Sequence, residues 1–224
     1  LVDSARGVLG RRFAGMALYG SLATGGFDPR RGDIDVVVLT DGDLPADALP
    51  VLADMHRALA AGSALGATLE VTYLPRQALR RHDPAAPPRP YWNEGRLRLD
   101  RHGPDWVIQR HVLRERGIVV AGPPVAAGID PVGPDELRRA VVEILEAWWA
   151  PMLDEPGRLV EPAYRAYVVL SLCRILHTHR TGEIAPKPMA ALWAREALGQ
   201  PWATSISRAE AWPEARSNIH VDDT

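Results

Sequence analysis

Two aspartates separated by a single residue are the first feature of this 224-residue chain that suggests chemistry. Asp33 and Asp35 flank Ile34 and open an apolar, valine-rich run that predicts a buried strand. Because residues i and i+2 of a strand point to the same face, the two carboxylates would lie ~6–7 Å apart. Like charges at this spacing repel unless a cation lies between them, and Mg²⁺ takes such oxygen pairs when it also binds substrate phosphates. The pair therefore predicts a magnesium site.

A Gly-Ser pair precedes the aspartates by a dozen residues. The run "GMALYG" at 15–20 predicts a strand that leads into a glycine-punctuated turn and a helix. Gly20 would let the backbone approach a ligand closely, and the Ser21 hydroxyl and following amides could hold phosphate oxygens. These two residues predict a phosphate-binding turn.

A third carboxylate, Glu70, opens the apolar run "LEVTYLP" at 69–75. In an antiparallel or mixed sheet it could lie beside the aspartates, near enough to ligate metal or to accept a proton from an attacking hydroxyl. Taken alone, an Asp-x-Asp, a Gly-Ser or a strand-edge glutamate is common and has simpler structural interpretations. Together, in this order, they predict phosphoryl-type transfer, in which a metal and positioned donors do most of the work.

The elements that must position these residues fall into an α/β half and a helical half. The expected strands are 15–20, 33–40, 69–75 and 117–122, and the expected helices between them are 46–62 and 105–117. A Pro- and Gly-rich segment at 121–134 predicts a boundary. Beyond it the pattern is helical, starting at Pro134 and with Gly182 and Gly199 placed as C-caps. We expect an α/β (α+β) domain with a mixed sheet over 1–122 and an all-helical domain over 123–224.

The interval 76–104 contains five prolines and is expected to be a functional loop. Residues 76–116 carry ten arginines against five acids, which is either a solvated face or a cationic wall near a polyanion. The net charge of −2 does not indicate nucleic-acid binding for the whole chain. A single cysteine, Cys173, excludes an internal disulfide, and no apolar run reaches the ~18 residues that span a bilayer, so a cytoplasmic location is expected.

At this point the sequence resembles a known family. The stretch "LYGSLATGGFDPRRGDIDVVVLT" is similar to the Gly-Ser and Asp-x-Asp signature of the nucleotidyltransferase superfamily that shares the DNA polymerase β palm. The stretch "VLSLCRILHTHRTGEIAPKPMAALWAREAL" at 169–198 resembles the C-terminal domain of the aminoglycoside 3''-adenylyltransferase family, and so does "VVAGPPVAAGIDPV" at the boundary. The resemblance covers nearly the whole chain.

The resemblance implies a role for each matching residue. Ser21 would contact nucleotide phosphates beside Gly20, Asp33 and Asp35 would hold Mg²⁺, and Glu70 would be the catalytic base. Arg174 and Lys187, the only lysine in the chain, match residues that reach the ATP phosphates from the second domain. A lysine on a proline-stiffened turn is a suitable point charge for a triphosphate, although the residues alone favour a solvated side chain.

The implied function is Mg²⁺-dependent transfer of AMP from ATP to a hydroxyl of an aminoglycoside or aminocyclitol of the spectinomycin or streptomycin type, with a role in antibiotic resistance. The expected partners are ATP and a small cationic antibiotic, with no membrane and no nucleic acid, and a monomer is expected. Acids and aromatics suit a polyamine drug, which selects Trp92, Glu94, Glu161 and Tyr164 as substrate-contacting candidates. The match is incomplete, because Tyr164 stands where the family has an aspartate and the loop with Trp92 and Glu94 aligns only with gaps.

Two alternatives remain open. The same chemistry could act on a protein or RNA hydroxyl, which the arginine-rich interval would support. The chain could also be a non-catalytic nucleotide-binding module, which the complete set of three carboxylates argues against.

Overall fold

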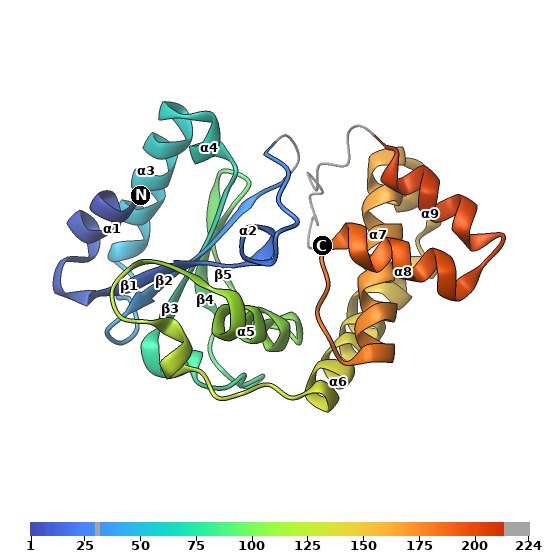
Figure 1. The fold of residues 1–224 in the computed structure, drawn as a ribbon. Coiled ribbons are helices and arrows are strands. Elements are labelled where there is room, and N and C mark those ends of the chain that lie inside the picture. Colours follow the sequence, from blue (N-terminus) through green and yellow to red (C-terminus); the bar gives the residue numbers. More distant parts are fainter. Residues whose placement is uncertain (30–31, 213–224) are drawn as a thin grey trace. The chain divides into compact units, whose positions relative to one another are not determined.

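The computed structural model describes residues 1–29 and 32–212, and the chain divides into two compact units. Leu1–Gly25 and Asp33–Val132 form the first unit, and the remaining described residues form the second (Figure 1). The first unit extends to Val132, beyond the boundary at residue 122 expected from the sequence, and Asp130 is hydrogen-bonded to other residues of this unit. The Asp130 amide donates to the Arg80 carbonyl at 3.1 Å, and its carboxylate accepts from Arg80 and Arg81.

The first unit is built on one six-stranded sheet with the order β5-β4-β3-β2-β1-β6. β2 and β3 are parallel and the other neighbours are antiparallel, so the expected mixed sheet is confirmed. The four strands expected from the sequence are present within one or two residues of their expected bounds. The strands are β1 (Phe13–Leu18), β2 (Ile34–Thr40), β3 (Leu69–Pro75), β4 (Arg89–Asn93), β5 (Arg96–Asp100) and β6 (Ile118–Ala121).

The interval expected to be a functional loop contains a β-hairpin instead. β4 and β5 pair antiparallel, and a 3₁₀ helix, η2 (Arg76–Leu79), precedes them. The tight turn between the strands places Glu94 at φ 50° and Gly95 at φ 76°. Positive φ at both central residues is typical of the two-residue turns that join hairpin strands. The letters "NEG" at 93–95 are therefore the sequence feature that indicates this turn.

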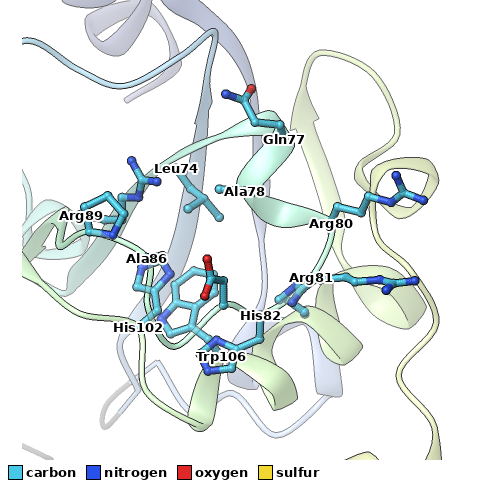
Figure 2. A pocket seen from close by; sticks show the side chains of 13 residues that line it. Leu74, Gln77, Ala78, Arg80, Arg81, His82, Ala86, Arg89, His102 and Trp106 are labelled. Atoms are coloured by element: carbon cyan, nitrogen blue, oxygen red, sulfur yellow. The ribbon is translucent and has the colours of Figure 1, made fainter.

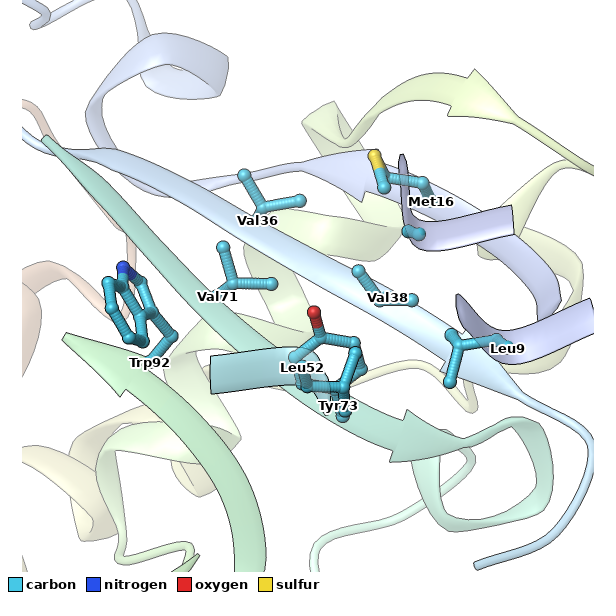
Figure 3. Close-up of a cluster of buried hydrophobic side chains, with 9 residues drawn as sticks. Leu9, Met16, Val36, Val38, Leu52, Val71, Tyr73 and Trp92 are labelled. Carbon is cyan, nitrogen blue, oxygen red and sulfur yellow. The ribbon is translucent and has the colours of Figure 1, made fainter. Parts of the chain in front are cut away.

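Helices α1 (Val2–Leu9) and α3 (Ala48–Gly62) pack on one face of this sheet, and the contact forms the main core. Figure 3 shows Leu9 and Leu52 meeting side chains from β1, β2, β3 and β4. Gly62 is the last residue of α3, and Ser63 caps the next short helix, α4 (Ala64–Ala67). The remaining helices of this unit are η1 (Gly10–Arg12), α2 (Gly20–Thr24), α5 (Asp105–Arg116) and η3 (Val125–Gly128).

The described part of the second unit is all helical, as expected. Gly182 ends α7 in the left-handed conformation at φ 76°, whereas Gly199 after α8 has φ 63° with an extended ψ. Its elements are α6 (Pro134–Ile144), a π turn η4 (Leu145–Trp149), η5 (Ala150–Leu153), η6 (Pro156–Val160), α7 (Pro162–Thr181), α8 (Lys187–Leu198) and α9 (Trp202–Glu210). Across residues 1–29 and 32–212, no helix has both the length and the hydrophobicity needed to cross a bilayer.

Candidate active site

The three candidate carboxylates lie at one end of the sheet. β2 and β3 run parallel in a register that sets Asp35 directly opposite Glu70, and Asp33 immediately precedes β2. Because side chains alternate along each strand, Asp35 and Glu70 share the sheet face opposite the core residues Val36 and Val71. The structure therefore brings together the two strand starts that the sequence singled out.

Gly20 lies against this pair. Its φ is +59°, and a Cβ built there would be 1.8 Å from Asp35 Oδ2, so no other residue fits without displacing the carboxylate. The neighbouring Tyr19 amide donates to the Asp35 carbonyl at 3.0 Å. The absence of a side chain at Gly20 lets the backbone lie against Asp35 at the start of α2, on which Ser21 also lies.

The electrostatics of the site centre on Glu70. Burial raises the pKa of Glu70 from its usual 4.5 to about 7, and the negative charge of Asp35 adds to the shift. Asp33 and Glu94 contribute in the same direction. A carboxyl group that titrates near neutral pH is suited to accept a proton in a reaction.

Tyr91 is a site residue that the sequence did not reveal. Its hydroxyl donates a 2.7 Å hydrogen bond to Glu70 Oε2, which opposes the upward shift of the Glu70 pKa. Tyr91 lies on β4, which pairs with β3 so that Tyr91 is opposite Thr72, two residues after Glu70. The Arg98 guanidinium lies 5.1 Å from the Tyr91 ring centroid. Recognition of the hairpin would have identified Tyr91, because its position on β4 matches the face of Glu70.

Tyr19 is the second residue that was missed. Its side chain is 4% exposed, and burial followed by the charges of Asp35 and Glu70 raises its pKa well above the usual range. It stays protonated at neutral pH and hydrogen-bonds with Thr72. It therefore forms part of the wall behind the carboxylates.

Two of the four substrate candidates are core residues, which corrects the expectation for them. Trp92 is 1% exposed and stacks on His56 with centroids 4.8 Å apart, on the face opposite Tyr91. Tyr164 is 4% exposed and its hydroxyl lies 3.1 Å from Met152 Sδ. Alternation on β4 and the packing of α7 turn these side chains inward.

The other two candidates are at surfaces. Glu161 is the N-cap of α7, where its carboxylate accepts from the amides of Ala163 at 3.1 Å and Tyr164 at 2.6 Å. Glu94 occupies the exposed β4–β5 turn, and its charge reaches Glu70. Of the two candidates in the first unit, Glu94 acts on the charge of Glu70, whereas Trp92 lies in the core.

The second unit holds the two cations expected to bind phosphates. Lys187 opens α8, and its Nζ lies 4.6 Å from the Tyr167 ring centroid. Arg174 follows Tyr167 by two turns of α7, so both lie on the same side of that helix. Both cations are half-buried.

The chemistry of the donors is compatible with Mg²⁺. In the part of the chain that is described, no group of three or more His, Cys, Asp or Glu side chains is placed to hold a metal by itself. Two carboxylates with further oxygens from water and phosphate are a usual set for Mg²⁺. The crowding of Asp33 and Asp35 near Glu70, which raises the Glu70 pKa, is the kind of charge conflict that a cation relieves.

Comparisons with known proteins agree with both halves of this description. The nucleotidyltransferase domain family matches residues 3–86, and the family described as aminoglycoside adenylyltransferase, C-terminal domain, matches residues 129–223. Residues 3–86 are therefore a nucleotidyltransferase domain, and residues 129–223 match the aminoglycoside adenylyltransferase C-terminal domain. The first match contains all three carboxylates, and the second contains Arg174 and Lys187.

Curated relatives of this family include aminoglycoside (3'') (9) adenylyltransferases of Klebsiella pneumoniae and Escherichia coli. Each is 37% identical over 94 residues, which is 42% of this chain and 33% of the relative. The aligned segment thus spans about a third of these relatives. Among solved structures, a spectinomycin adenyltransferase from Enterococcus faecialis with ATP and spectinomycin has a TM-score of 0.75, at 18% identity over 98% of this chain and 89% of that one. The chain therefore shares the fold of that structure over 98% of its length.

Proposed function

We propose that the protein is an adenylyltransferase that moves AMP from ATP to a hydroxyl of an aminoglycoside or aminocyclitol antibiotic of the spectinomycin or streptomycin type, releasing pyrophosphate. The observation that carries the proposal is the parallel pairing of Asp35 with Glu70 beside Gly20. This pairing supports the assignment of Asp35 as a metal ligand and Glu70 as a base beside a phosphate-binding turn. The names of the similar proteins support the choice of acceptor.

Each residue has one task in this proposal. Ser21 and the amides of α2 bind nucleotide phosphates, which aligns the α-phosphate with the acceptor. Asp33 and Asp35 hold Mg²⁺, which supplies positive charge to offset the charge of the phosphates. Arg174 and Lys187 bind the same triphosphate and stabilise the departing pyrophosphate.

Glu70 accepts the proton of the acceptor hydroxyl as that oxygen attacks the α-phosphate. Burial and the charge of Asp35 raise the pKa of Glu70 to about 7, which makes it a stronger base than an ordinary glutamate. A cation held by Asp33 and Asp35 would favour its ionised form. Tyr91 occupies one of its oxygens, Oε2, so Oε1 is the oxygen assigned to the acceptor. The bond thereby orients the base.

The test is mass spectrometry of spectinomycin and streptomycin after incubation with the protein, ATP and Mg²⁺. The expected result is an added AMP on at least one drug, with an equimolar release of pyrophosphate. Glu70→Gln should lower the rate by about 100-fold or more, because loss of a general base typically costs 10²–10⁴.

Two controls define the outcome. Glu115→Gln changes an exposed glutamate that pairs with Arg114 on α5, and it should leave the rate unchanged. AMP found only on added protein or tRNA would contradict the antibiotic acceptor. The absence of AMP transfer to any of these acceptors would contradict the enzymatic proposal.

A further inference from the structure

Three arginines that line a cavity of the first unit are bonded to groups of that unit. Figure 2 shows Arg80 and Arg81 extended away from Trp106, and both donate to the carboxylate of Asp130. Arg110 is 3% exposed, and its Nε donates to a backbone carbonyl at 2.7 Å. The contacts of these three side chains favour a structural role over the cationic wall that the arginine-rich sequence left open.

Lys187 of the second unit, the only lysine in the chain, lies over an aromatic ring. Its Nζ is 4.6 Å from the ring centroid of Tyr167. A cation within ~6 Å of a ring centroid is attracted by the negative potential of the ring face. The residues alone favour a solvated side chain for Lys187, whereas the structure shows a half-buried side chain with its ammonium against a ring.

The backbone position of Lys187 does not favour its positive charge. Lys187 is the first residue of α8, where the helix dipole opposes a cation. The N-cap is Pro186, and the first turn contains no acidic residue that would offset the charge. Lys187 is therefore stabilised by groups from outside its own helix, and Tyr167 of α7 is one of them.

The Tyr167 ring is itself held by two buried aromatic side chains, Trp149 and Tyr164. The Trp149 ring lies 6.0 Å away at an interplanar angle of 44°, and the Tyr164 ring stacks at 6.2 Å and 16°. Trp149 ends the π turn η4 and is 8% exposed, and Tyr164 is 4% exposed. Aromatic pairs at such distances attract one another. The three rings, called here the aromatic seat, therefore give the ammonium of Lys187 a fixed surface.

Tyr167 also determines on which side of α7 the ammonium lies. Arg174 follows Tyr167 by two turns, so both side chains leave the same side of α7. Lys187 belongs to α8, but its Nζ lies over Tyr167 and thus on the side of Arg174. Cations from two helices on one surface suit a ligand with several negative charges, such as a nucleoside triphosphate.

We propose that Tyr167 is a positioning residue that holds the Lys187 ammonium in place for the phosphates of a bound nucleotide, with the aromatic seat as its support. The inference rests on the proposed function, which assigns Lys187 to the ATP phosphates. A mobile lysine loses rotational freedom when it binds phosphate, and this loss weakens binding. A lysine that a ring already orders loses less freedom, so Tyr167 strengthens ATP binding by acting through Lys187.

The first test is NMR of protein labelled with ¹³C-lysine, in which Lys187 gives the only lysine signals. Protons over an aromatic face are shifted upfield by the ring current, so the Hε signal of Lys187 should lie upfield of that of a solvated lysine. It should return to the solvated position in Tyr167→Leu and stay upfield in Tyr167→Phe, which keeps the ring. Trp193→Leu is the matched control, because it removes a partly buried ring that contacts His177 between the same two helices.

The second test is isothermal titration calorimetry with ATP and Mg²⁺ in the absence of an acceptor. Tyr167→Leu should weaken ATP binding about 3- to 10-fold, because a cation–π contact and the order that it imposes are lost. Tyr167→Phe and Trp193→Leu should bind ATP like the wild type. In the Lys187→Ala background, Tyr167→Leu should have no additional effect, because Tyr167 acts through Lys187.

Three results would overturn the inference and leave the proposed function standing. They are a wild-type Lys187 signal at the solvated position, equal ATP affinity of Tyr167→Leu and the wild type, and an equally large effect of Tyr167→Leu in the Lys187→Ala background. Absence of ATP binding by the wild type would contradict the proposed function and this inference together. Should Tyr167→Leu unfold, Tyr167→Met takes its place in both measurements, because a flexible methionine fills irregular gaps.

Discussion

At the scale of single residues, the hydroxyl of Tyr91 distinguishes Glu70 from an ordinary buried carboxyl. The 2.7 Å bond favours the ionised form of Glu70, whereas burial and Asp35 oppose it. Tyr91→Phe removes the bond, so the pKa of Glu70 should rise above about 7. Glu70 acts as a base only when it is ionised. The pH at which kcat reaches half of its maximum should therefore be higher in the variant than in the wild type. We expect kcat at pH 7 to fall about 10-fold with KM for ATP unchanged, measured from pH profiles of both constants.

Tyr73→Phe is the matched control for this prediction. Its hydroxyl lies 2.7 Å from His56 Nε2 on the opposite face of the same sheet. The variant loses a tyrosine hydroxyl that is buried more deeply than that of Tyr91, so it should lose about 1 kcal/mol of stability without a change in the pH profile of kcat. A pH profile of Tyr91→Phe that superimposes on the wild type would contradict the role of Tyr91.

At the scale of elements, Gly20 joins β1 to α2 at a position where backbone conformation and space both exclude a side chain. Gly20→Ala would force a Cβ to within 1.8 Å of Asp35 Oδ2 at φ +59°. We expect displacement of Asp35, a loss of Mg²⁺-dependent ATP binding by about 10-fold or more, and destabilisation of at least ~1 kcal/mol. Calorimetry with ATP and Mg²⁺, together with thermal unfolding, measures both effects.

Gly25 ends the same helix and offers a matched control. Its φ is +80°, but a Cβ there would meet nothing within 4 Å. Gly25→Ala should therefore show the backbone strain of about 1 kcal/mol without the loss of binding. Equal loss of ATP binding in both variants would show that backbone strain, and not the contact with Asp35, explains the effect.

The same elements show how far the sequence predicts the site. Apolar, β-branched runs identified β2 and β3. Once these strands are paired, the alternation of side chains places Asp35 and Glu70 on the same face. Trp92 was misassigned because its strand was not recognised, so the face on which it lies could not be known. Tyr164 was misassigned because an aromatic side chain was expected to suit a polyamine drug, whereas the structure shows its hydroxyl against Met152 in a packed core. Contacts between distant segments, such as Tyr91 with Glu70, follow from strand order, which local patterns do not encode.

At the scale of the whole molecule, the two units have separate cores. The core of the first unit lies between the sheet and helices α1 and α3. The second unit has two hydrophobic clusters, one among α7, α8 and α9 and one around η4 and η5. Units with their own cores can unfold in separate transitions. A ligand that binds only the folded chain stabilises the units that contact it by RT ln(1 + [L]/Kd). The proposed function assigns ATP-binding residues to each unit, so ATP should stabilise both.

Differential scanning calorimetry with and without ATP and Mg²⁺ tests this expectation. At about 100 times Kd, ATP should add ~2.7 kcal/mol of stability to the folded chain, seen as a rise in Tm of both units. Lys187→Ala should reduce the shift of the helical unit while leaving the shift of the sheet unit, because Asp33, Asp35 and Ser21 remain. Arg180→Ala removes an exposed cation from the last turn of α7 and should leave both shifts intact. An ATP shift confined to the sheet unit in the wild type would contradict the assignment of Lys187 and Arg174 to the nucleotide.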